Sequence, residues 1–282
     1  MKGGFELGEF EITWLNGGSF ELDGGAMFGV VPKALWSKKY PANEDNTISM
    51  VAWPLLIKTP DGLVLIESGL GNKLTEKQKQ IFRVKEEWSV LEDLKSLGLK
   101  REDISHIILT HYDFDHAGGV VMKDAKKEGY SLTFPMAKHV IQAKEWEDVM
   151  SPNIRSINTY WPVNNEILRA HPNLNLINGD YEVVKGIRTV HTGGHTKGYQ
   201  IVIMESRGQM AVYPCDLLPT HAHFNPLWIM AYDNFPLESI GKKEELEKEF
   251  VEKGAWFIFY HDPFVLACKF DEKGNIVEKY SS

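Results

Sequence analysis

The sequence predicts an α/β fold in which two β-sheets are covered by helices. Apolar segments typical of strands recur in both halves of the 282-residue chain, helix-like segments separate them, and a charged helix-like segment precedes the last apolar strand. Elements in this order pack as layers around a shared core. The chain shows neither a fixed-period repeat nor a low-complexity linker, so we expect a single domain over residues 1–282.

Strand-like segments dominate the first 70 residues. Strands are predicted over residues 11–15, 50–58 and 63–67. The turn residues Asn16-Gly17-Gly18 and Pro60-Asp61-Gly62 separate them. A helix is predicted over residues 74–98, because Trp88, Leu91, Leu94 and Leu97 recur three apart and Gly98 is a typical helix stop.

The rest of the chain alternates strands and helices. Helices are predicted over residues 143–150 and 242–252, the second with Leu246 and Phe250 on its buried side. The predicted strands cover residues 106–110, 137–142, 186–191, 200–204, 209–213 and 256–260.

Composition excludes several classes of protein. The chain is 43% hydrophobic and 25% charged, as in ordinary globular proteins. Its net charge is -8 and no basic cluster offsets this, so we expect no nucleic-acid partner. The longest apolar segments, residues 51–57 and 256–260, are too short to cross ~30 Å of hydrocarbon, and we expect no membrane association.

The cysteines and the first residues bear on location. Cys215 and Cys268 show no CxxC spacing, and we expect reduced thiols. Residues 1–14 lack a basic segment followed by an apolar one, which predicts no signal peptide. We therefore expect a cytoplasmic protein.

Several apolar strands are followed directly by histidine or aspartate. These residues are His111, His191, His195, Asp216 and His261. Loops that follow strand ends can converge on one cleft. Imidazoles and carboxylates without cysteine suit zinc, iron, manganese or cobalt.

The segment from His111 to His116 is the strongest indication of metal binding. A tight loop can direct His111 and Asp113 to one ion, and Asp115 and His116 to a neighbouring one. A helix could not do this, because residues two apart face away from each other. Burying two imidazoles and two carboxylates so close together is costly unless a cation compensates. The isolated residues His106, His139 and His171 are expected to be structural.

The same residues resemble the motifs of the metallo-β-lactamase superfamily. Residues 111–119 resemble its HxHxDH signature, and further motifs match Glu67-Ser68-Gly69, residues 191–198, Asp216 and His261, in that order. The resemblance implies a four-layer αββα sandwich and a hydrolase with two divalent metal ions. Zinc is expected first, with iron, cobalt or manganese as alternatives.

Within the superfamily the chain is most similar to YtnP-type N-acyl-homoserine lactonases. The matching segments are residues 13–18, 23–33, 153–156, 219–223 and 256–262. The resemblance implies a quorum-quenching enzyme that opens the lactone ring of N-acyl-homoserine lactones with a hydroxide held between two ions. A homodimer is compatible with it. A phosphotriesterase or aryl-ester hydrolase with the same metals is the alternative, and a non-catalytic, metal-stabilised binding module is the third hypothesis.

The resemblance also assigns roles to residues. One ion is expected to bind His111, Asp113 and His195, and the other Asp115, His116 and His261, with Asp216 shared between them. Asp115 is also expected to be catalytic, as the group that protonates the leaving alkoxide.

The chain departs from the family pattern at three positions. Asp113 replaces a histidine ligand, Glu67 replaces an aspartate that supports the metal loop, and Pro219 occupies the place of a substrate-binding tyrosine. Tyr232, His221 and His223 are the candidates to replace that tyrosine, and Met27 and Phe28, with Val30, Trp36 and Trp228, are candidates for the wall that binds the acyl chain.

Overall fold

The computed structural model describes residues 2–124 and 129–281. Within these residues the chain forms two seven-stranded sheets. In spatial order the first sheet contains β1 (Lys2–Leu7), β2 (Phe10–Trp14), β5 (Leu55–Thr59), β6 (Gly62–Ile66), β7 (Ile104–Ile108), β10 (Lys138–Gln142) and β11 (Leu174–Ile177). The second contains β12 (Tyr181–Val184), β13 (Ile187–His191), β14 (Gln200–Ser206), β15 (Gln209–Tyr213), β16 (Trp256–Ile258), β17 (Ala267–Phe270) and β18 (Ile276–Tyr280).

Two hairpins and a set of helices complete the described chain. The hairpins pair β3 (Ser19–Asp23) with β4 (Thr47–Val51), and β8 (Val121–Lys123) with β9 (Tyr130–Leu132). The α-helices are α1 (Gly24–Phe28), α2 (Lys33–Trp36), α3 (Glu76–Ile81), α4 (Val90–Ser96), α5 (Phe114–Ala117), α6 (Ala143–Met150), α7 (Pro162–Arg169) and α8 (Pro236–Glu252). Short 3₁₀ turns are η1 (Arg101–Asp103), η2 (Cys215–Leu217) and η3 (His221–His223).

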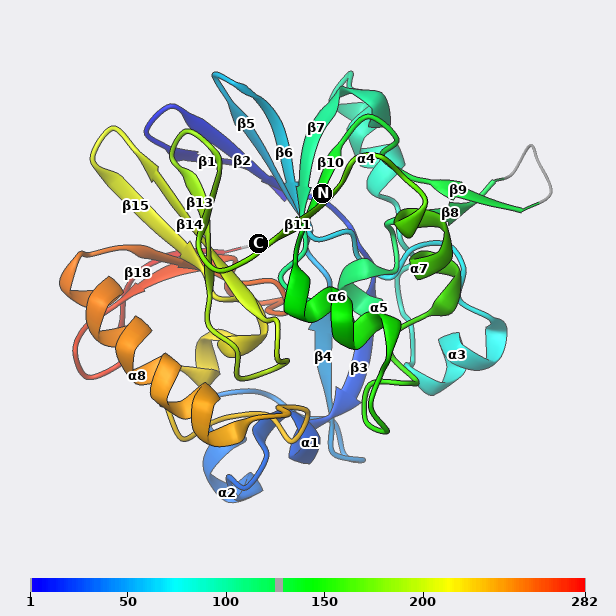
Figure 1. Ribbon diagram of the computed structural model, residues 1–282. Helices are drawn as coiled ribbons and strands as arrows, with labels where there is room; N and C mark the ends of the chain where they lie inside the picture. The colour runs from blue at the N-terminus through cyan, green and yellow to red at the C-terminus, as the bar shows by residue number, and fades with distance from the viewer. Residues whose placement is uncertain (1, 125–128, 282) are drawn as a thin grey trace.

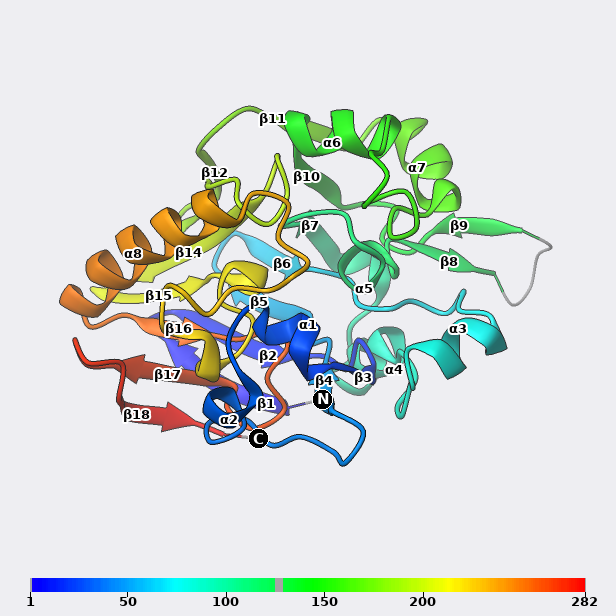
Figure 2. The same cartoon turned by 90° about the horizontal axis from the view of Figure 1, so that it is seen from below.

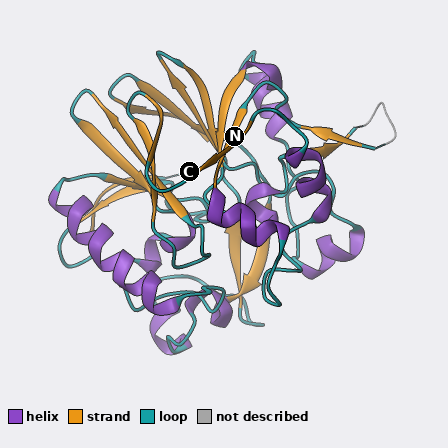
Figure 3. Ribbon diagram, in the orientation of Figure 1, coloured by secondary structure: helices purple, strands orange, loops and turns teal. Residues whose placement is uncertain are grey.

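The sheets and helices form the four-layer αββα sandwich expected from the sequence (Figures 1 and 3). Side chains alternate across a strand, so one sheet serves two cores. Ile57 and Val64 belong to the large core that also contains Phe257 of the second sheet. Leu56 and Leu65 face the other way, into a core shared with α4 and α6. Figure 2 shows α6 and α7 on one side of the molecule and α8 on the other.

Several predicted elements are confirmed, and two are wrong. The helix over residues 143–150 and the strand over 209–213 have the predicted bounds. The strand predicted over 50–58 is instead two strands, β4 and β5, which belong to different sheets. Pro54 lies in the break, where its carbonyl accepts a hydrogen bond from Leu15 N, and a proline cannot donate to a sheet ladder.

The helix predicted over residues 74–98 is also wrong as a single element. It consists of α3 and α4, and the chain between them runs beside β3. Backbone N–H groups of Ser19 and Glu21 donate to the carbonyls of Glu86 and Phe82. The residues between α3 and α4 therefore form backbone hydrogen bonds with β3 instead of a helix, although their sequence has a weak helical periodicity. No helix among the described residues is long and apolar enough to cross a membrane.

The sheet directions bring strand ends together at one edge. β13 and β15 both run antiparallel to β14, and β16 runs parallel to β15. The carboxyl ends of β13, β15 and β16 therefore meet at the same edge of the second sheet. Gln200 links this edge to the end of β7 in the first sheet, because its N–H donates to Thr110 O and its Nε2 donates to Leu109 O. The loops after four strands thus face one another.

Candidate metal centre

Six of the predicted ligands form two groups at this edge. His111, Asp113 and His195 make one group, and Asp115, His116 and His261 make the other. Within each group one ligand atom from every residue lies within 4.8 Å of the others. In the first group, Asp113 Oδ2 lies 3.6 Å from His111 Nε2 and 3.7 Å from His195 Nε2. In the second, Asp115 Oδ2 lies 3.7 Å from Nε2 of both histidines.

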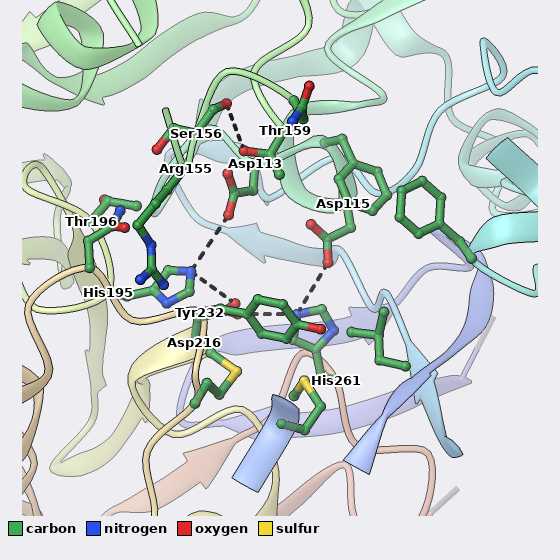
Figure 4. A pocket seen from close by; sticks show the side chains of 17 residues that line it. Asp113, Asp115, Arg155, Ser156, Thr159, His195, Thr196, Asp216, Tyr232 and His261 are labelled. Atoms are coloured by element: carbon green, nitrogen blue, oxygen red, sulfur yellow. Dashed lines mark hydrogen bonds and ion pairs between the residues drawn. The ribbon is translucent and has the colours of Figure 1, made fainter. Parts of the chain in front are cut away.

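Asp216 lies between the two groups and directs one oxygen toward each (Figure 4). Its Oδ2 is 3.5 Å from His195 Nε2 and 4.0 Å from His111 Nε2. Its Oδ1 is 3.2 Å from His261 Nε2 and 3.4 Å from His116 Nε2. The predicted shared position of Asp216 therefore has a geometric basis in this structure.

The ring nitrogens that face away from the centre have their own partners. His195 Nδ1 lies 2.8 Å from Asp233 Oδ1, and His261 Nδ1 lies 2.8 Å from the carbonyl oxygen of Val51. Since a carbonyl oxygen only accepts, Nδ1 of His261 carries a proton, and Nε2 is the ring nitrogen that faces the centre. Contacts of this kind fix the orientation of metal-binding imidazoles.

Glu67 supports the metal loop, as expected for the first motif. Its Oε1 accepts a hydrogen bond of 3.0 Å from the backbone N–H of Thr110, and its Oε2 lies 3.7 Å from His116 Nδ1. The thiol of Cys215 is also close, with Sγ 3.6 Å from the same nitrogen. Burial raises the pKa of the Glu67 carboxyl to about 7 and that of the Cys215 thiol well above its usual value.

Sequence reasoning missed Glu145, which holds two of the loops together. This carboxylate is fully buried at the start of α6. Its Oε1 accepts hydrogen bonds of 2.9 Å from Tyr112 N and from the Tyr160 hydroxyl, and its Oε2 accepts one of 2.6 Å from Thr196 Oγ1. The loop after β7 is thereby joined to the loop after β13. A single acidic residue in the first turn of a helix gives no signal of this role.

Sequence reasoning also missed Asp233, the partner of His195. Its side chain is buried, 38 residues along the chain from the histidine. Asn234 N donates to His195 O and Phe235 N donates to Gly194 O, so the backbone of the segment is fixed beside the ligand loop. Asp233 lies outside every recognised motif, and only the folded chain reveals it.

The charges at the centre favour a cation. Burial alone would raise the pKa of Asp113, but the neighbouring imidazoles of His111 and His195 bring it well below its usual range. Burial raises the pKa of Asp115 to about 6, against the opposing effect of His261. Burial also lowers the pKa of His116 well below its usual value, whereas at His111, His195 and His261 the neighbouring carboxylates overcome the effect of burial and raise the pKa.

The donor set fits divalent metal ions. His111 Nε2 is buried and has no hydrogen-bond partner among the described residues. Nε2 of His116 lies 3.2 Å from Nε2 of His261, so two ring nitrogens face each other in a buried space. Three carboxylates converge on the same space, and a cation would satisfy all of these atoms. Two imidazoles and one carboxylate in each group suit zinc, iron, manganese or cobalt.

A cavity of about 290 Å³ opens beside the centre (Figure 4). Asp113, Asp115, His195, Asp216 and His261 form its polar floor. Its remaining lining residues are Leu22, Met27, Phe82, Phe114, Arg155, Ser156, Asn158, Thr159, Thr196, Met230, Tyr232 and Asn234. The cavity therefore combines the candidate metal ligands with an apolar wall and a polar rim.

The five predicted substrate-binding residues divide into two sets. Met27 and Tyr232 line the cavity, as expected. Phe28, His221 and His223 do not line this cavity.

Phe28 and His223 lie in the core behind the cavity wall, and His221 is partly exposed. Phe28 is buried and stacks on the His223 ring, with 4.3 Å between ring centroids. His223 Nε2 donates a hydrogen bond of 2.9 Å to the carbonyl oxygen of Met27. His221 pairs with the buried carboxylate of Asp262. Contacts within the protein thus engage the rings of Phe28, His221 and His223, which the sequence analysis offered as candidates for substrate binding.

Comparisons with known proteins agree with this geometry. The family model of the metallo-beta-lactamase superfamily matches residues 51–255. This chain belongs to the metallo-β-lactamase superfamily. A crystal structure of a probable metal-dependent hydrolase from Staphylococcus aureus is 41% identical, with a TM-score of 0.92 over 99% of both chains.

More distant metallo-β-lactamase relatives include lactonases. An N-acyl homoserine lactonase of Bacillus cereus is 29% identical over 175 residues, which is 57% of this chain and 61% of that protein. The chain thus spans about three fifths of the length of the curated relatives it matches. The solved structure of AidC, a dizinc quorum-quenching lactonase in complex with a product, is 22% identical with a TM-score of 0.79 over 99% of this chain and 98% of that one. This last likeness shows the fold.

Membership of the superfamily implies divalent metal ions and hydrolytic chemistry. The seven predicted ligands lie where the fold brings strand ends together, in the segments that follow β7, β13, β15 and β16. Family membership and the converging donor atoms are therefore those of a family of metal-dependent hydrolases.

Proposed function

We propose that the protein is an N-acyl-homoserine lactonase with two metal ions, and that Zn²⁺ is their first candidate. The observation that carries the proposal is the position of Asp216, with one oxygen toward each ligand group, at the floor of an amphipathic cavity. Such ions lower the pKa of bound water toward ~7 and polarise an ester carbonyl. The names of the lactonase relatives support the choice of substrate.

The cavity walls offer separate places for the two ends of such a substrate. The polar floor takes the lactone ring. Met27, Phe114 and Met230 provide apolar surface for the acyl chain. A ligand with a polar head and an apolar tail is thereby held in one orientation, and its ester carbonyl faces the carboxylates and imidazoles.

Asp115 is the proposed proton donor. When the ring C–O bond breaks, the leaving alkoxide needs a proton. Asp115 lines the cavity, and burial raises the pKa of its carboxyl to about 6. A carboxyl group fixed beside the reacting atoms can take the proton of the attacking hydroxide and pass it to the leaving oxygen, because its geometry is already set. Its place in the second ligand group keeps its oxygen close to the breaking bond.

Tyr232 is the proposed replacement for the tyrosine that the lactonases carry where this chain has Pro219. Of the three residues considered for this role, it alone lines the cavity. Burial raises the pKa of its phenol, which therefore remains a hydrogen-bond donor at neutral pH. The hydroxyl would orient the substrate by donating to one of its oxygens.

Steady-state kinetics tests the proposal. Metal-replete protein is assayed with N-hexanoyl-homoserine lactone and with a paraoxon-type phosphotriester, which represents the alternative activity. We expect the larger kcat/KM for the lactone, and chelation should abolish it. A preference for the triester of about a hundredfold, or 2.7 kcal/mol of transition-state stabilisation, would overturn the assignment. The phosphotriester is included because this chain has Pro219 in the place of the substrate-binding tyrosine of the lactonases.

A further inference from the structure

Arg155 is presented to the cavity by two separate anchors. It lies in the segment between α6 and α7, and its side chain is part of the cavity lining (Figure 4). Asn153 Oδ1 accepts hydrogen bonds from the backbone N–H groups of Arg155 and Ser156, at 2.8 and 3.2 Å, and so closes the turn. At the other end, Arg155 Nη2 donates a hydrogen bond of 2.6 Å to the carbonyl oxygen of Ala231. The guanidinium is therefore held in place before any ligand arrives.

The charge of Arg155 has no counterion in the described part of the chain. No carboxylate there lies within ion-pair distance of its guanidinium, although 39 acidic residues are present in the sequence. Among the residues that line the cavity, it is also the only lysine or arginine. A guanidinium has five N–H donors, and the bond to Ala231 accounts for one of them. The remaining donors are available to a ligand.

The surroundings of Arg155 indicate which part of a ligand it meets. Ser156, Asn158 and Thr159 line the cavity from the same segment, so this side is polar. Leu22, Met27 and Phe82 provide the apolar lining. A molecule that fills the cavity thus needs acceptor oxygens at the polar side, in addition to the carbonyl that faces the candidate metal ligands.

We propose that Arg155 is a specificity-determining residue, which binds an acceptor oxygen of the substrate beyond the carbonyl that is hydrolysed. The proposal rests on the proposed function and names the oxygen of the acyl amide as the ligand in a neutral substrate. A carboxylate on the acyl chain presents the same chemistry, because a guanidinium pairs with carbonyl and carboxylate oxygens alike. Arg155 binds the substrate and takes no part in breaking the ring.

A comparison of matched substrates tests the role of Arg155. Wild type and Arg155→Met are assayed with N-hexanoyl-homoserine lactone and with an alkyl γ-lactone of similar length that has no amide. Loss of one charge-assisted hydrogen bond should raise KM for the acylated lactone about tenfold, with kcat unchanged. KM for the amide-free lactone should stay within about twofold, because it lacks the oxygen that Arg155 binds.

A third substrate identifies the source of the oxygen. An N-acyl lactone whose chain ends in a carboxylate is assayed with the same two proteins. If wild type prefers it to the neutral lactone and Arg155→Met removes the preference, the carboxylate is the ligand. If the two acylated lactones respond equally to the substitution, the amide oxygen is the ligand.

Three control variants separate binding from a merely structural role. Arg155→Lys retains a donor for Ala231 but loses the planar fork, so its KM should lie between those of wild type and Arg155→Met. Asn153→Ala loosens the turn without removing the guanidinium, and it should affect both lactones equally. Arg207→Met removes an exposed arginine that pairs with Glu9, and no kinetic change is expected.

Two results would overturn the proposal. An equal rise in KM for the amide-bearing and amide-free lactones would show that Arg155 only tethers the segment to Ala231. If wild type hydrolyses neither lactone, the proposed function fails, and calorimetric binding of the ring-opened N-hexanoyl-homoserine to the metal-loaded protein decides the role of Arg155. An affinity about tenfold weaker in Arg155→Met would support the subsite, and equal affinities would refute it.

Discussion

His195 Nδ1 and Asp233 Oδ1 lie 2.8 Å apart, and both side chains are buried. The neighbours of Asp233 in the chain, Tyr232 and Asn234, line the cavity. One segment therefore orients a candidate metal ligand and shapes the substrate wall. A substitution of Asp233 should therefore alter the orientation of His195, and a substitution of His195 should alter the position of Asp233.

Replacing Asp233 should weaken metal binding through His195. Asp233→Ala removes the acceptor that fixes the imidazole, and losses of about 10- to 100-fold in metal affinity are typical for such partners. Asp233→Asn, which can still accept a hydrogen bond, should be milder. Chelator competition followed by metal analysis measures both. The exposed Asp61→Ala is the control, and an unchanged affinity in Asp233→Ala would contradict the expected role.

Replacing Asp216 should be more damaging than replacing Asp233. Asp216→Ala removes an oxygen from each ligand group, so it affects both ions directly. We expect kcat to fall by more than about a hundredfold, because loss of a direct ligand should exceed loss of a supporting one. Metal analysis should show fewer than two ions per chain. Retention of two ions with full turnover would exclude the shared position of Asp216.

Asp115→Asn should separate catalysis from folding. The substitution keeps the shape of the side chain but removes the ionisable group, so the fold should persist while turnover falls by more than about a hundredfold, within the usual range for acid–base catalysis. Circular dichroism tests whether the fold persists, and turnover is compared at metal concentrations where metal analysis finds equal loading of the two proteins. Unchanged turnover would make Asp115 a bystander and would exclude its proposed role as the proton donor.

Gly198→Ala should destabilise the protein without touching a ligand. A Cβ at Gly198 would lie 2.1 Å from the backbone nitrogen of Glu145, so helix α6 would have to move. Overpacking of this kind costs about 1–3 kcal/mol and lowers Tm by several degrees. In contrast, a Cβ at Gly241 in α8 meets no atom within 4 Å. Gly241→Ala should raise stability by about 0.5–1 kcal/mol, and calorimetry compares the two. Equal Tm values for the two variants would contradict the expected steric clash at Gly198.

His139 should make the protein sensitive to acid. Both ring nitrogens are buried without a partner among the described residues, and burial lowers the pKa to about 4 from 6.5. Between these values the unfolded chain binds a proton that the folded chain does not, so stability falls as the pH drops from 6.5 to about 4. The loss should be on the order of 3 kcal/mol.

His139→Leu isolates this contribution. Urea unfolding of wild type and variant at pH 7 and pH 4.5 gives the difference in pH dependence, in which the effects of all other groups cancel. We expect the variant to lose less stability on acidification. Parallel losses in the two proteins would show that His139 is not the titrating group.

The sequence indicated which histidines and aspartates converge, because the spacing of such residues is constrained by chemistry. His111, Asp113, Asp115 and His116 follow one strand within a few residues, and each has to face an ion. The layered fold was predictable for a similar reason, since strand and helix periodicities are local. Residues that act through another side chain carry no such pattern. Glu145 and Asp233 are ordinary acids in the sequence, and only tertiary contacts place them beside the ligand loops.

The substrate wall was harder to predict because burial has competing causes. Phe28 and His223 lie close in space to Met27, but stacking between their rings turns them into the core. The two rings stack on each other in the core and do not face the cavity. Tyr232 is 42% exposed and free of such packing, and it lines the cavity.

The aspartate at position 113 gives the two halves of the centre the same set of donor atoms. Each half now offers two imidazoles, one carboxylate of its own and one oxygen of Asp216. Donor type and formal charge therefore give neither half a preference for a softer or harder ion. Exposed to a mixture of divalent cations, the protein should fill both halves in the same proportions rather than sort the ions between them.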